Sequence, residues 1–304
     1  MIGMQAPEPD WKGVHTMLKP AELNALYHAA KDDFNGEGAA VDLGTWLGGS
    51  TVAMLEGLSR NNQPHAAAQV VHAYDKFELN AYLKSHYPMP ELEAIPAGGS
   101  FLPVFEAQVA PWKLQVRTYA GDLNAIGWRG GPIELLHVDI MKTWPLANSV
   151  VKFFFAELIP GRSLIFHQDF VHFNTVWIHL LMHRFRDHFE LVRHIPGTTT
   201  AVFRFRSAIA PEDLERSYGF ADFVADEARA AFAWSRSLVD TSTLHHFNID
   251  AAEAMLHVHK GEKDEARALL DRFVKEEQRF LADHPHIKGR SELAKVELAL
   301  AKLM

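Results

Sequence analysis

The alternation of short apolar runs with amphipathic stretches from Ala39 onward constrains the fold of this chain more than any other feature. Such alternation is typical of βαβ units, in which crossover helices join parallel strands. The apolar runs predict strands at residues 39–46, 70–77, 114–120, 133–140, 163–170, 189–194 and 199–206. The intervening stretches predict helices at residues 50–59, 91–109, 148–158 and 173–188.

Only the segment Ile195–Thr198 separates the last two predicted strands, and it contains a Pro-Gly pair. A connection this short predicts an antiparallel hairpin rather than another crossover. A plain nicotinamide-binding fold would instead continue in βα alternation. The sequence therefore predicts an α/β fold with a doubly wound, Rossmann-like seven-stranded sheet that ends in an antiparallel hairpin.

The chain has 304 residues, which is more than one hydrophobic core usually serves. Strand signals stop after Ser207, and helices are expected at residues 211–237, 249–260, 263–283 and 291–303. We therefore expect an N-terminal helical segment over residues 1–34, an α/β domain over 35–207 and an all-α extension over 208–304. Residues 261–273 resemble the second helix of a tetratricopeptide unit, but a repeat array needs several such units.

The composition excludes several classes of protein. A net charge of −8 without a Lys/Arg block argues against nucleic acid as a partner. The absence of cysteine excludes disulfides, thiolate catalysis and Cys-based zinc sites. No apolar run approaches the roughly 18 residues that span a bilayer, and the N-terminus lacks the pattern of a secretory signal. These features predict a cytoplasmic protein without a membrane partner.

A glycine-rich turn joins the first predicted strand to the first predicted crossover helix, in the segment Val41-Asp42-Leu43-Gly44-Thr45-Trp46-Leu47-Gly48-Gly49-Ser50-Thr51. Glycines there permit a tight turn and close approach to a ligand, and Ser50 is placed to cap the helix. Asp75 ends the second strand, and Asp122 follows the third. Acids at the carboxyl ends of successive strands face the crevice where open α/β sheets bind ligands. The alternative is that Asp42 and Asp75 only cap helices.

The turn is similar to motif I of small-molecule O-methyltransferases, E/D-x-G-x-x-x-G-x-S, and the resemblance covers about residues 35–207. These enzymes belong to the class I S-adenosylmethionine-dependent methyltransferases, whose seven-stranded sheet closes with a hairpin. The resemblance implies S-adenosylmethionine as cofactor, with Asp42 near its amino-acid end and Asp75 on its ribose. The other residues it assigns to the cofactor are Gly44, Gly48 and Ser50 in the turn, Asp122 on the adenine side, and Trp46, Lys76 and Asp139.

The fourth and fifth predicted strands end in His137-Val138-Asp139-Ile140-Met141-Lys142 and His167-Gln168-Asp169-Phe170. These ends resemble those of metal-dependent catechol-type and macrolide-sugar O-methyltransferases. The resemblance implies that Asp139, Gln168 and Asp169 hold Mg²⁺ or another divalent cation. A hard cation prefers oxygen ligands and lowers the pKa of a coordinated hydroxyl. Gln168 departs from the family pattern because it replaces an acid and so removes a negative charge.

Three residues are candidates for the chemistry itself. Lys142 stands three residues after Asp139, as in the catechol-type enzymes, and would steer the proton. Without a metal, Asp139 or a nearby histidine would act alone as the base, and His172 is the histidine in question. His179 and His183 share a helix face, and for this pair we expect packing or hydrogen bonding rather than metal binding.

The residues together predict transfer of a methyl group from S-adenosylmethionine to a hydroxyl of a small molecule, either a sugar or a polyhydroxylated compound. Two alternatives remain. One is a non-catalytic, methyltransferase-like protein that binds S-adenosylmethionine or S-adenosylhomocysteine and uses its C-terminal helices for a protein partner or a homodimer. The other is an NAD-dependent oxidoreductase, which also needs a glycine turn and an acid on a ribose.

Overall fold

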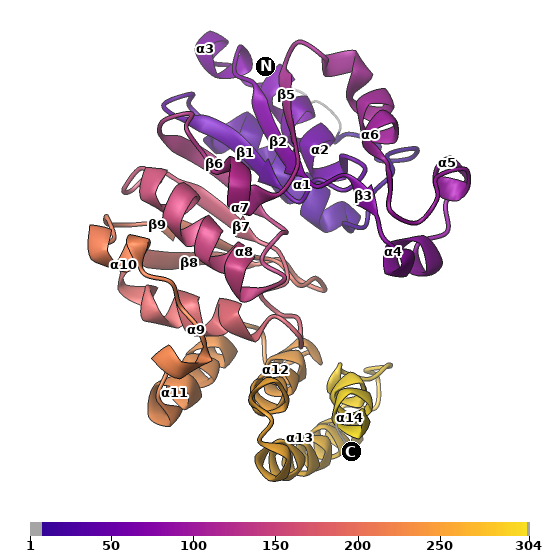
Figure 1. Cartoon of the computed structure of the whole chain (residues 1–304), viewed down its shortest axis with the longest axis vertical. Coiled ribbons are helices and arrows are strands. Elements are labelled where there is room, and N and C mark those ends of the chain that lie inside the picture. The colour runs from indigo at the N-terminus through magenta and orange to yellow at the C-terminus, as the bar shows by residue number, and fades with distance from the viewer. Residues whose placement is uncertain (1–7, 303–304) are drawn as a thin grey trace, which may run out of the picture. The chain divides into compact units, whose positions relative to one another are not determined.

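A computed structural model describes residues 8–302, so residues 1–7 of the predicted N-terminal segment and residue 303 of the last predicted helix lie outside the described residues. All seven predicted strands are present in one sheet of order β5-β2-β1-β6-β7-β9-β8 (Figure 1). They are β1 (Ala39–Leu43), β2 (Val71–Asp75), β5 (Val116–Ala120), β6 (Ile133–Val138), β7 (Leu164–His167), β8 (Phe189–His194) and β9 (Ala201–Phe205).

The direction of the strands matches the prediction. β1 pairs in parallel with β2 and β6, β2 pairs in parallel with β5, and β8 pairs antiparallel with β9. The chain proceeds from β1 outward to β2 and β5, then returns to the other side of β1 with β6. The β1/β6 boundary is therefore the topological switch point of the sheet, where α/β folds of this kind bind ligands. The predicted fold class is confirmed.

The chain divides into two compact units. The first unit comprises the residues up to Ile140 together with Glu157–Phe166, and the second comprises Met141–Ala156 together with the residues from His167 onward. The predicted boundaries at 34/35 and 207/208 remain predictions. Across residues 8–302, no helix combines the length and apolar character needed to cross a bilayer.

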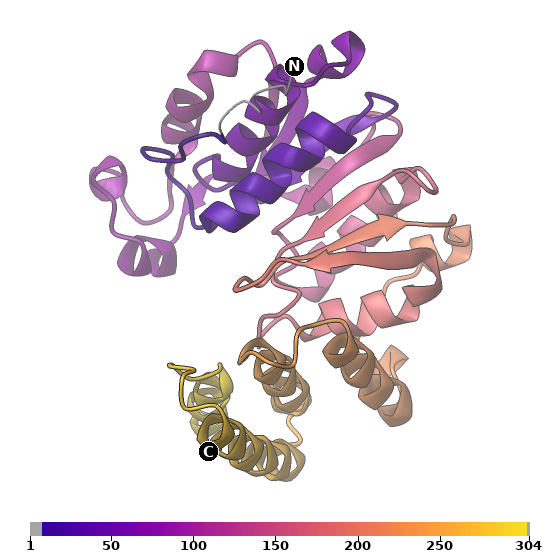
Figure 2. The same cartoon turned by 180° about the vertical axis from the view of Figure 1, so that it is seen from behind.

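In the first unit, two helices pack together across the strands, as Figure 2 shows. They are α1 (Pro20–His28), which continues as a π-helical turn over Ala29–Asp33, and α2 (Gly49–Ser59). Gly57 permits their close contact, because a Cβ at this position would lie 2.4 Å from the carbonyl oxygen of Tyr27. Two short helices complete the connections, α3 (Pro64–Ala67) and α7 (Leu123–Ile126).

The predicted helix over residues 91–109 is wrong as a single element. The segment after β2 forms β3 (Glu78–Leu79), α4 (Ala81–His86), α5 (Pro90–Glu93), β4 (Gly99–Ser100), α6 (Leu102–Val109) and a 3₁₀ turn over Ala110–Trp112. Pro90 and Pro103 lie in the first turns of α5 and α6, where a missing amide hydrogen costs nothing, so each proline begins a new helix. Gly98 has φ +84° and precedes β4, which pairs antiparallel with β3.

The second unit contains β8, β9 and the remaining helices. The helices are α8 (Trp144–Ser149), α9 (Val176–Arg184), α10 (Pro211–Glu215), α11 (Ala225–Ser237), α12 (His245–Lys260), α13 (Lys263–Asp283) and α14 (Leu293–Ala301). After α8 the chain continues as a π-helical turn over Val150–Phe154 and a 3₁₀ turn over Phe155–Glu157. Two further 3₁₀ turns lie at Arg186–His188, after α9, and at Phe220–Asp222, before α11. The predicted helix over 211–237 is thus wrong as one element. The chain leaves the helical conformation at Arg216, and the amide of Tyr218 donates to the side chain of Asn148 at 2.9 Å.

The C-terminal helices share a core with the α/β part of the second unit. His179 on α9 bonds through Nδ1 to the hydroxyl of Ser235 on α11 at 2.9 Å, and Arg184 on α9 makes a two-pronged contact with Glu227 at 2.6 and 2.7 Å. Burial lowers the pKa of His179 to about 3, so its ring is neutral and takes part in packing, as expected.

A buried ionic cluster joins α11 to α12. The guanidinium of Arg236 donates to Asp250 at 2.9 Å and to Glu253 at 2.8 Å. Burial raises the pKa of Asp250 to about 7, because desolvation of its carboxylate outweighs the attraction of Arg236 and the charge of Glu253 adds repulsion. A carboxyl whose pKa is higher in the folded than in the unfolded protein holds its proton more tightly when folded. Its contribution to stability is therefore complete below about pH 4 and is lost as the pH rises through about 7.

We predict that Asp250→Asn flattens this pH dependence, because an amide can still accept from Arg236 but does not titrate. Between pH 5 and pH 8, the wild type should lose more free energy of unfolding than the variant, by up to about 1.4 kcal/mol for each unit by which the pKa is raised. Urea unfolding at each pH measures this, with Asp271→Asn on the exposed face of α13 as control. Parallel pH profiles for wild type and D250N would contradict the prediction.

Candidate functional site

In the first unit, the carboxyl ends of β1, β2 and β6 meet at one edge of the sheet. The strands run in register, with Leu43 opposite Tyr74 on β2 and Val138 on β6. Just beyond them, the amide of Gly44 donates to Tyr74 and the amide of Asp139 donates to Leu43, both at 2.8 Å. The structure therefore brings Asp42, Asp75 and Asp139 to the same edge, at the switch point of the sheet.

The glycines of the turn are required by packing within the protein. Gly44 has φ +85°, and a Cβ there would lie 2.4 Å from the carbonyl oxygen of Asp139. A Cβ on Gly48, with φ +98°, would lie 3.0 Å from the ring of Phe105, and one on Gly49 would lie 2.2 Å from the hydroxyl of Thr16. The glycines thus let the turn lie against β6 and α6, rather than being left open for a ligand.

Asp42 lies beneath the turn and is completely buried. Its carboxylate accepts hydrogen bonds from the hydroxyls of Ser50 at 2.8 Å and Thr51 at 2.5 Å, and contacts His137 Nδ1 at 2.8 Å. Ser50 therefore fixes Asp42 and does not cap α2, whose N-cap is Gly48. Burial alone would lower the pKa of His137, but the hydrogen bond and charge of Asp42 outweigh it and raise the pKa. Asp42 and His137 form a buried ion pair across β1 and β6.

Asp75 has a different environment, because backbone amides hold its carboxylate at the edge of the sheet. Trp46 N donates to Oδ2 at 2.9 Å and Phe77 N donates to Oδ1 at 2.8 Å. Burial raises the pKa of Asp75, and these amides counteract it only in part. Trp46 and Phe77 both have positive φ, +49° and +53°, which is unfavourable for bulky residues and is concentrated at functional sites. The indole Nε1 of Trp46 is buried without a hydrogen-bond partner among the described residues.

Two further residues expected at the cofactor lie at the surface. Asp122 is exposed and caps α7, accepting from the amide of Asn124 at 2.9 Å. Lys76 is exposed and pairs with Glu78 at 2.5 Å. The hydrogen bond to Glu78 raises the pKa of Lys76, and the charge of Asp122 adds to the effect. Asp122 and Lys76 thus carry opposite charges close together on the protein surface.

In the second unit, Lys142 and Asp169 form an ion pair. Burial raises the pKa of the Asp169 carboxyl, but the positive charge of Lys142 outweighs it, so the net pKa is lowered and the carboxylate is ionised. Asp169 also has a positive φ of +59°. The ion pair holds the ammonium of Lys142 beside the Asp169 carboxylate.

Gln168, the predicted metal ligand that departs from the family pattern, is engaged within the protein. Its amide nitrogen donates to the hydroxyl of Thr199 at 3.0 Å, and its carbonyl oxygen accepts from the hydroxyl of Thr200. Between residues 8 and 302, no group of three or more His, Cys, Asp or Glu side chains is arranged to hold a metal ion. With Asp169 paired to Lys142, these residues do not fit a hard dication.

His172 lies in the loop between β7 and α9. Its Nδ1 accepts from the amide of Asn174 at 3.3 Å, and its Nε2 lies 3.7 Å from a carboxylate oxygen of Glu292. A ring whose Nδ1 accepts carries its proton on Nε2, which here faces an acid. In this arrangement His172 has no lone pair left to take a proton from a substrate.

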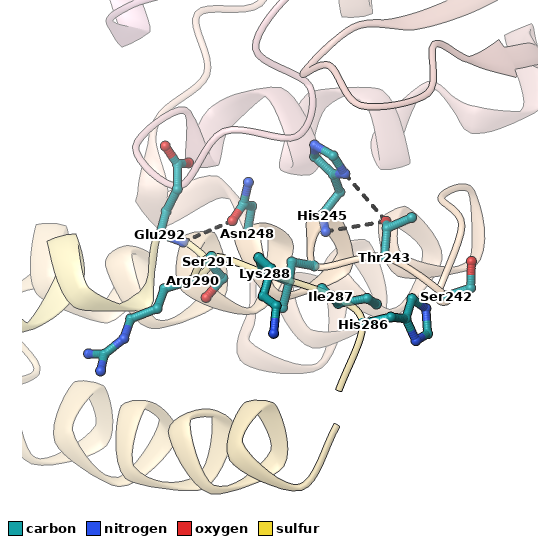
Figure 3. Close-up of a pocket in the computed structure, with 12 residues that line it drawn as sticks. Ser242, Thr243, His245, Asn248, His286, Ile287, Lys288, Arg290, Ser291 and Glu292 are labelled. Atoms are coloured by element: carbon teal, nitrogen blue, oxygen red, sulfur yellow. Dashed lines mark hydrogen bonds between the residues drawn. The ribbon is translucent and has the colours of Figure 1, made fainter. Parts of the chain in front are cut away.

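A cavity of about 520 Å³ lies among the C-terminal helices, where the sequence suggested no site. Figure 3 shows it between the loop that enters α12 and the loop that enters α14. Its lining includes the cationic side chains of Lys288 and Arg290 together with His245, Asn248 and Glu292. None of the predicted site residues lines it.

Several contact residues were not predicted. The sequence alone assigns no role to His137, although the pairing of β1 with β6 places it opposite Asp42. Nothing in the sequence indicated that Thr51 would bond to Asp42, or that Thr199 and Thr200 would bond to Gln168. Glu292 lies more than 100 residues beyond the loop it contacts, and no local pattern marks it.

Comparison with known proteins gives distant structural likenesses. No protein-family model and no curated protein matches the chain. It is similar to the O-methyltransferase NovP, with 14% identity, a TM-score of 0.45, and coverage of 64% of this chain and 83% of that one. The pyocyanin biosynthetic protein PhzM has 14% identity and a TM-score of 0.37, covering 60% of this chain and 54% of that one. The 23S rRNA methyltransferase ErmE has 12% identity and a TM-score of 0.38, covering 95% and 99%. At these values the likenesses do not assign the chain to a family.

We predict that Gly44→Ala is strongly destabilising. A left-handed backbone costs a non-glycine residue about 1–2 kcal/mol, and the clash of a Cβ with Asp139 adds about 1–3 kcal/mol. Gly161→Ala is the matched control, because Gly161 has φ +75° but nothing within 4 Å of its Cβ position. Urea unfolding compares the two variants, and equal losses of stability would show that the contact with Asp139 is not tight.

Proposed function

We propose that this chain is an S-adenosylmethionine-dependent methyltransferase that acts on a hydroxyl of a small molecule, a sugar or a polyhydroxylated compound. The observation that carries the proposal is the position of Asp75. A backbone-fixed carboxylate ends the strand next to the switch point, beside a glycine turn that leads into a helix. This is the place and the chemistry with which α/β folds hold the ribose of an adenosine.

The residues around Asp75 fit such a group. The Asp75 carboxylate accepts backbone amides from Trp46, Phe77 and Lys76, and because a carboxylate offers about four acceptor sites, one remains for a ribose hydroxyl. The indole N–H of Trp46, which is buried without a hydrogen-bond partner among the described residues, would supply a further donor. Gly44, Gly48 and Ser50 would shape the turn, and Asp122 and Lys76 would border the adenine from the surface. Asp42 would act indirectly, by holding Ser50 and Thr51 in place.

S-adenosylmethionine, when bound, supplies a methyl group attached to a sulfonium. The protein must then hold an acceptor hydroxyl in line with that methyl group and remove its proton. We assign the proton to the carboxylate of Asp139, which is half-buried at the switch point. His172 and Lys142 belong to the second unit, and their predicted roles, as base and as the residue that steers the proton, remain predictions.

A divalent cation has no part in this proposal, because the amide of Gln168 is engaged by Thr199 and Thr200. The same feature supports the non-catalytic alternative, in which the protein binds the cofactor or its product without turnover. An NAD-dependent oxidoreductase would also use an acid at the position of Asp75, so ligand choice must decide between them. A cytoplasmic location, a small-molecule substrate and a homodimer or protein partner through the C-terminal helices remain predictions.

We predict that S-adenosylhomocysteine binds the full chain and that NAD does not, as measured by calorimetry. Asp75→Asn should weaken S-adenosylhomocysteine binding about tenfold or more, because hydrogen bonds to a charged group contribute about 1.5–3 kcal/mol. Asp32→Asn is the control, since Asp32 is an exposed acid on the π-helical turn that follows α1. Binding of NAD alone would rule out methyl transfer, and equal affinities of D75N and D32N would remove Asp75 from the site.

A further inference from the structure

The loop between β7 and α9 forms a compact turn. The amide of His172 donates to the carbonyl of Asp169 at 3.2 Å, and the hydroxyl of Thr175 donates to the same carbonyl at 2.8 Å. These bonds fold residues 169–175 back on the end of β7. Because Asp169 itself has φ +59° and forms the ion pair with Lys142, the placement of that pair depends on the shape of this loop.

The backbone amide of Phe173, within this turn, forms a hydrogen bond with a residue near the C-terminal end of the chain. Its N–H donates to Oε2 of Glu292 at 2.9 Å. The other oxygen of Glu292 lies 3.7 Å from Nε2 of His172. One carboxylate at the start of α14 therefore contacts two consecutive residues of the loop. A hydrogen bond from an amide to a charged acceptor is one of the stronger kinds.

Glu292 is itself held by two of the C-terminal helices. Its backbone amide donates to the side chain of Asn248 on α12 at 2.9 Å, as Figure 3 shows. The ammonium of Lys295 on α14 donates to Oε1 at 2.7 Å and lies 5.2 Å from the centre of the Phe173 ring. The side chain of Glu292 points away from Lys288 and Arg290 (Figure 3), and only 17% of it is exposed. Its carboxylate is thus committed to the loop.

We propose that Glu292 is a positioning residue that couples the helices α12–α14 to the loop carrying Asp169. The C-terminal helices then support the loop that carries Asp169, rather than forming a separable surface for partners. The coupling acts within the second unit, on the loop and on the Lys142–Asp169 pair, and it does not depend on the proposed methyl transfer.

Hydrogen–deuterium exchange on the full chain tests the coupling. In Glu292→Ala the amide of Phe173 loses its acceptor and should exchange about tenfold faster or more, as expected for loss of a hydrogen bond to a charged group. Glu292→Gln keeps an acceptor oxygen and should restore exchange to near the wild-type rate. Glu297→Ala is the matched control, because it breaks an ion pair of α14 with Arg267 but touches no loop residue. Glu292→Asp, which is too short to reach the loop, replaces E292A if that variant does not fold.

Equal exchange at residues 169–175 in E292A and E297A would overturn the proposal. Binding of S-adenosylhomocysteine, measured on the same proteins, distinguishes failure of this proposal from failure of the proposed function. If the wild type binds no S-adenosylhomocysteine, methyl transfer is refuted while the exchange data still decide the role of Glu292.

Discussion

The buried ion pair between Asp42 and His137 is the contact on which the candidate site depends. A carboxylate with no exposure to water is tolerated only when all its oxygens are satisfied, and here two hydroxyls and an imidazole do so. These partners come from the start of α2 and from β6, so one side chain fixes the helix, the turn and the neighbouring strand together. The turn then places the Trp46 amide where it donates to Asp75. Asp42, which the sequence suggested as a cofactor ligand, therefore supports the position of Asp75, which is partly exposed.

The order and direction of the strands could be predicted because apolar runs and short turns reflect local chemistry. Strand ends were placed two or three residues too far where an aromatic residue follows soon after the last strand residue, as at Trp46, Phe77 and Phe170. Phe77 has positive φ, a property that no hydrophobic pattern reveals. The two helices that were predicted as single elements, over 91–109 and 211–237, were interrupted by prolines and by side-chain contacts with distant residues. Pro103, inside the first of these spans, was visible in the sequence as a helix break, whereas the contact of Tyr218 with Asn148 was not.

For the candidate site, topology alone indicated which acids reach the edge of the sheet, because parallel strands end on the same side. It did not indicate which acids face a ligand. Asp42 and Asp75 both follow apolar strand residues, yet Asp42 is sealed by Ser50, Thr51 and His137, whereas Asp75 is partly exposed and held by backbone amides. The same limit applies to Gln168, whose threonine partners lie about 30 residues away on the hairpin.

The separation of the β1 and β6 residues has a consequence for how the protein forms. Asp42 and His137 are 95 residues apart, and β1 gains its second neighbour only when β6 has been synthesised. Until then, one edge of a strand whose residues are all buried in the native protein lacks hydrogen-bond partners, which is the kind of surface that aggregates during folding. The β8–β9 hairpin and the α12–α13 pair are joined by short turns and close quickly. The β1–β6 pairing therefore closes a much longer loop than these local contacts, and the higher cost in loop-closure entropy makes the centre of the sheet slower to form.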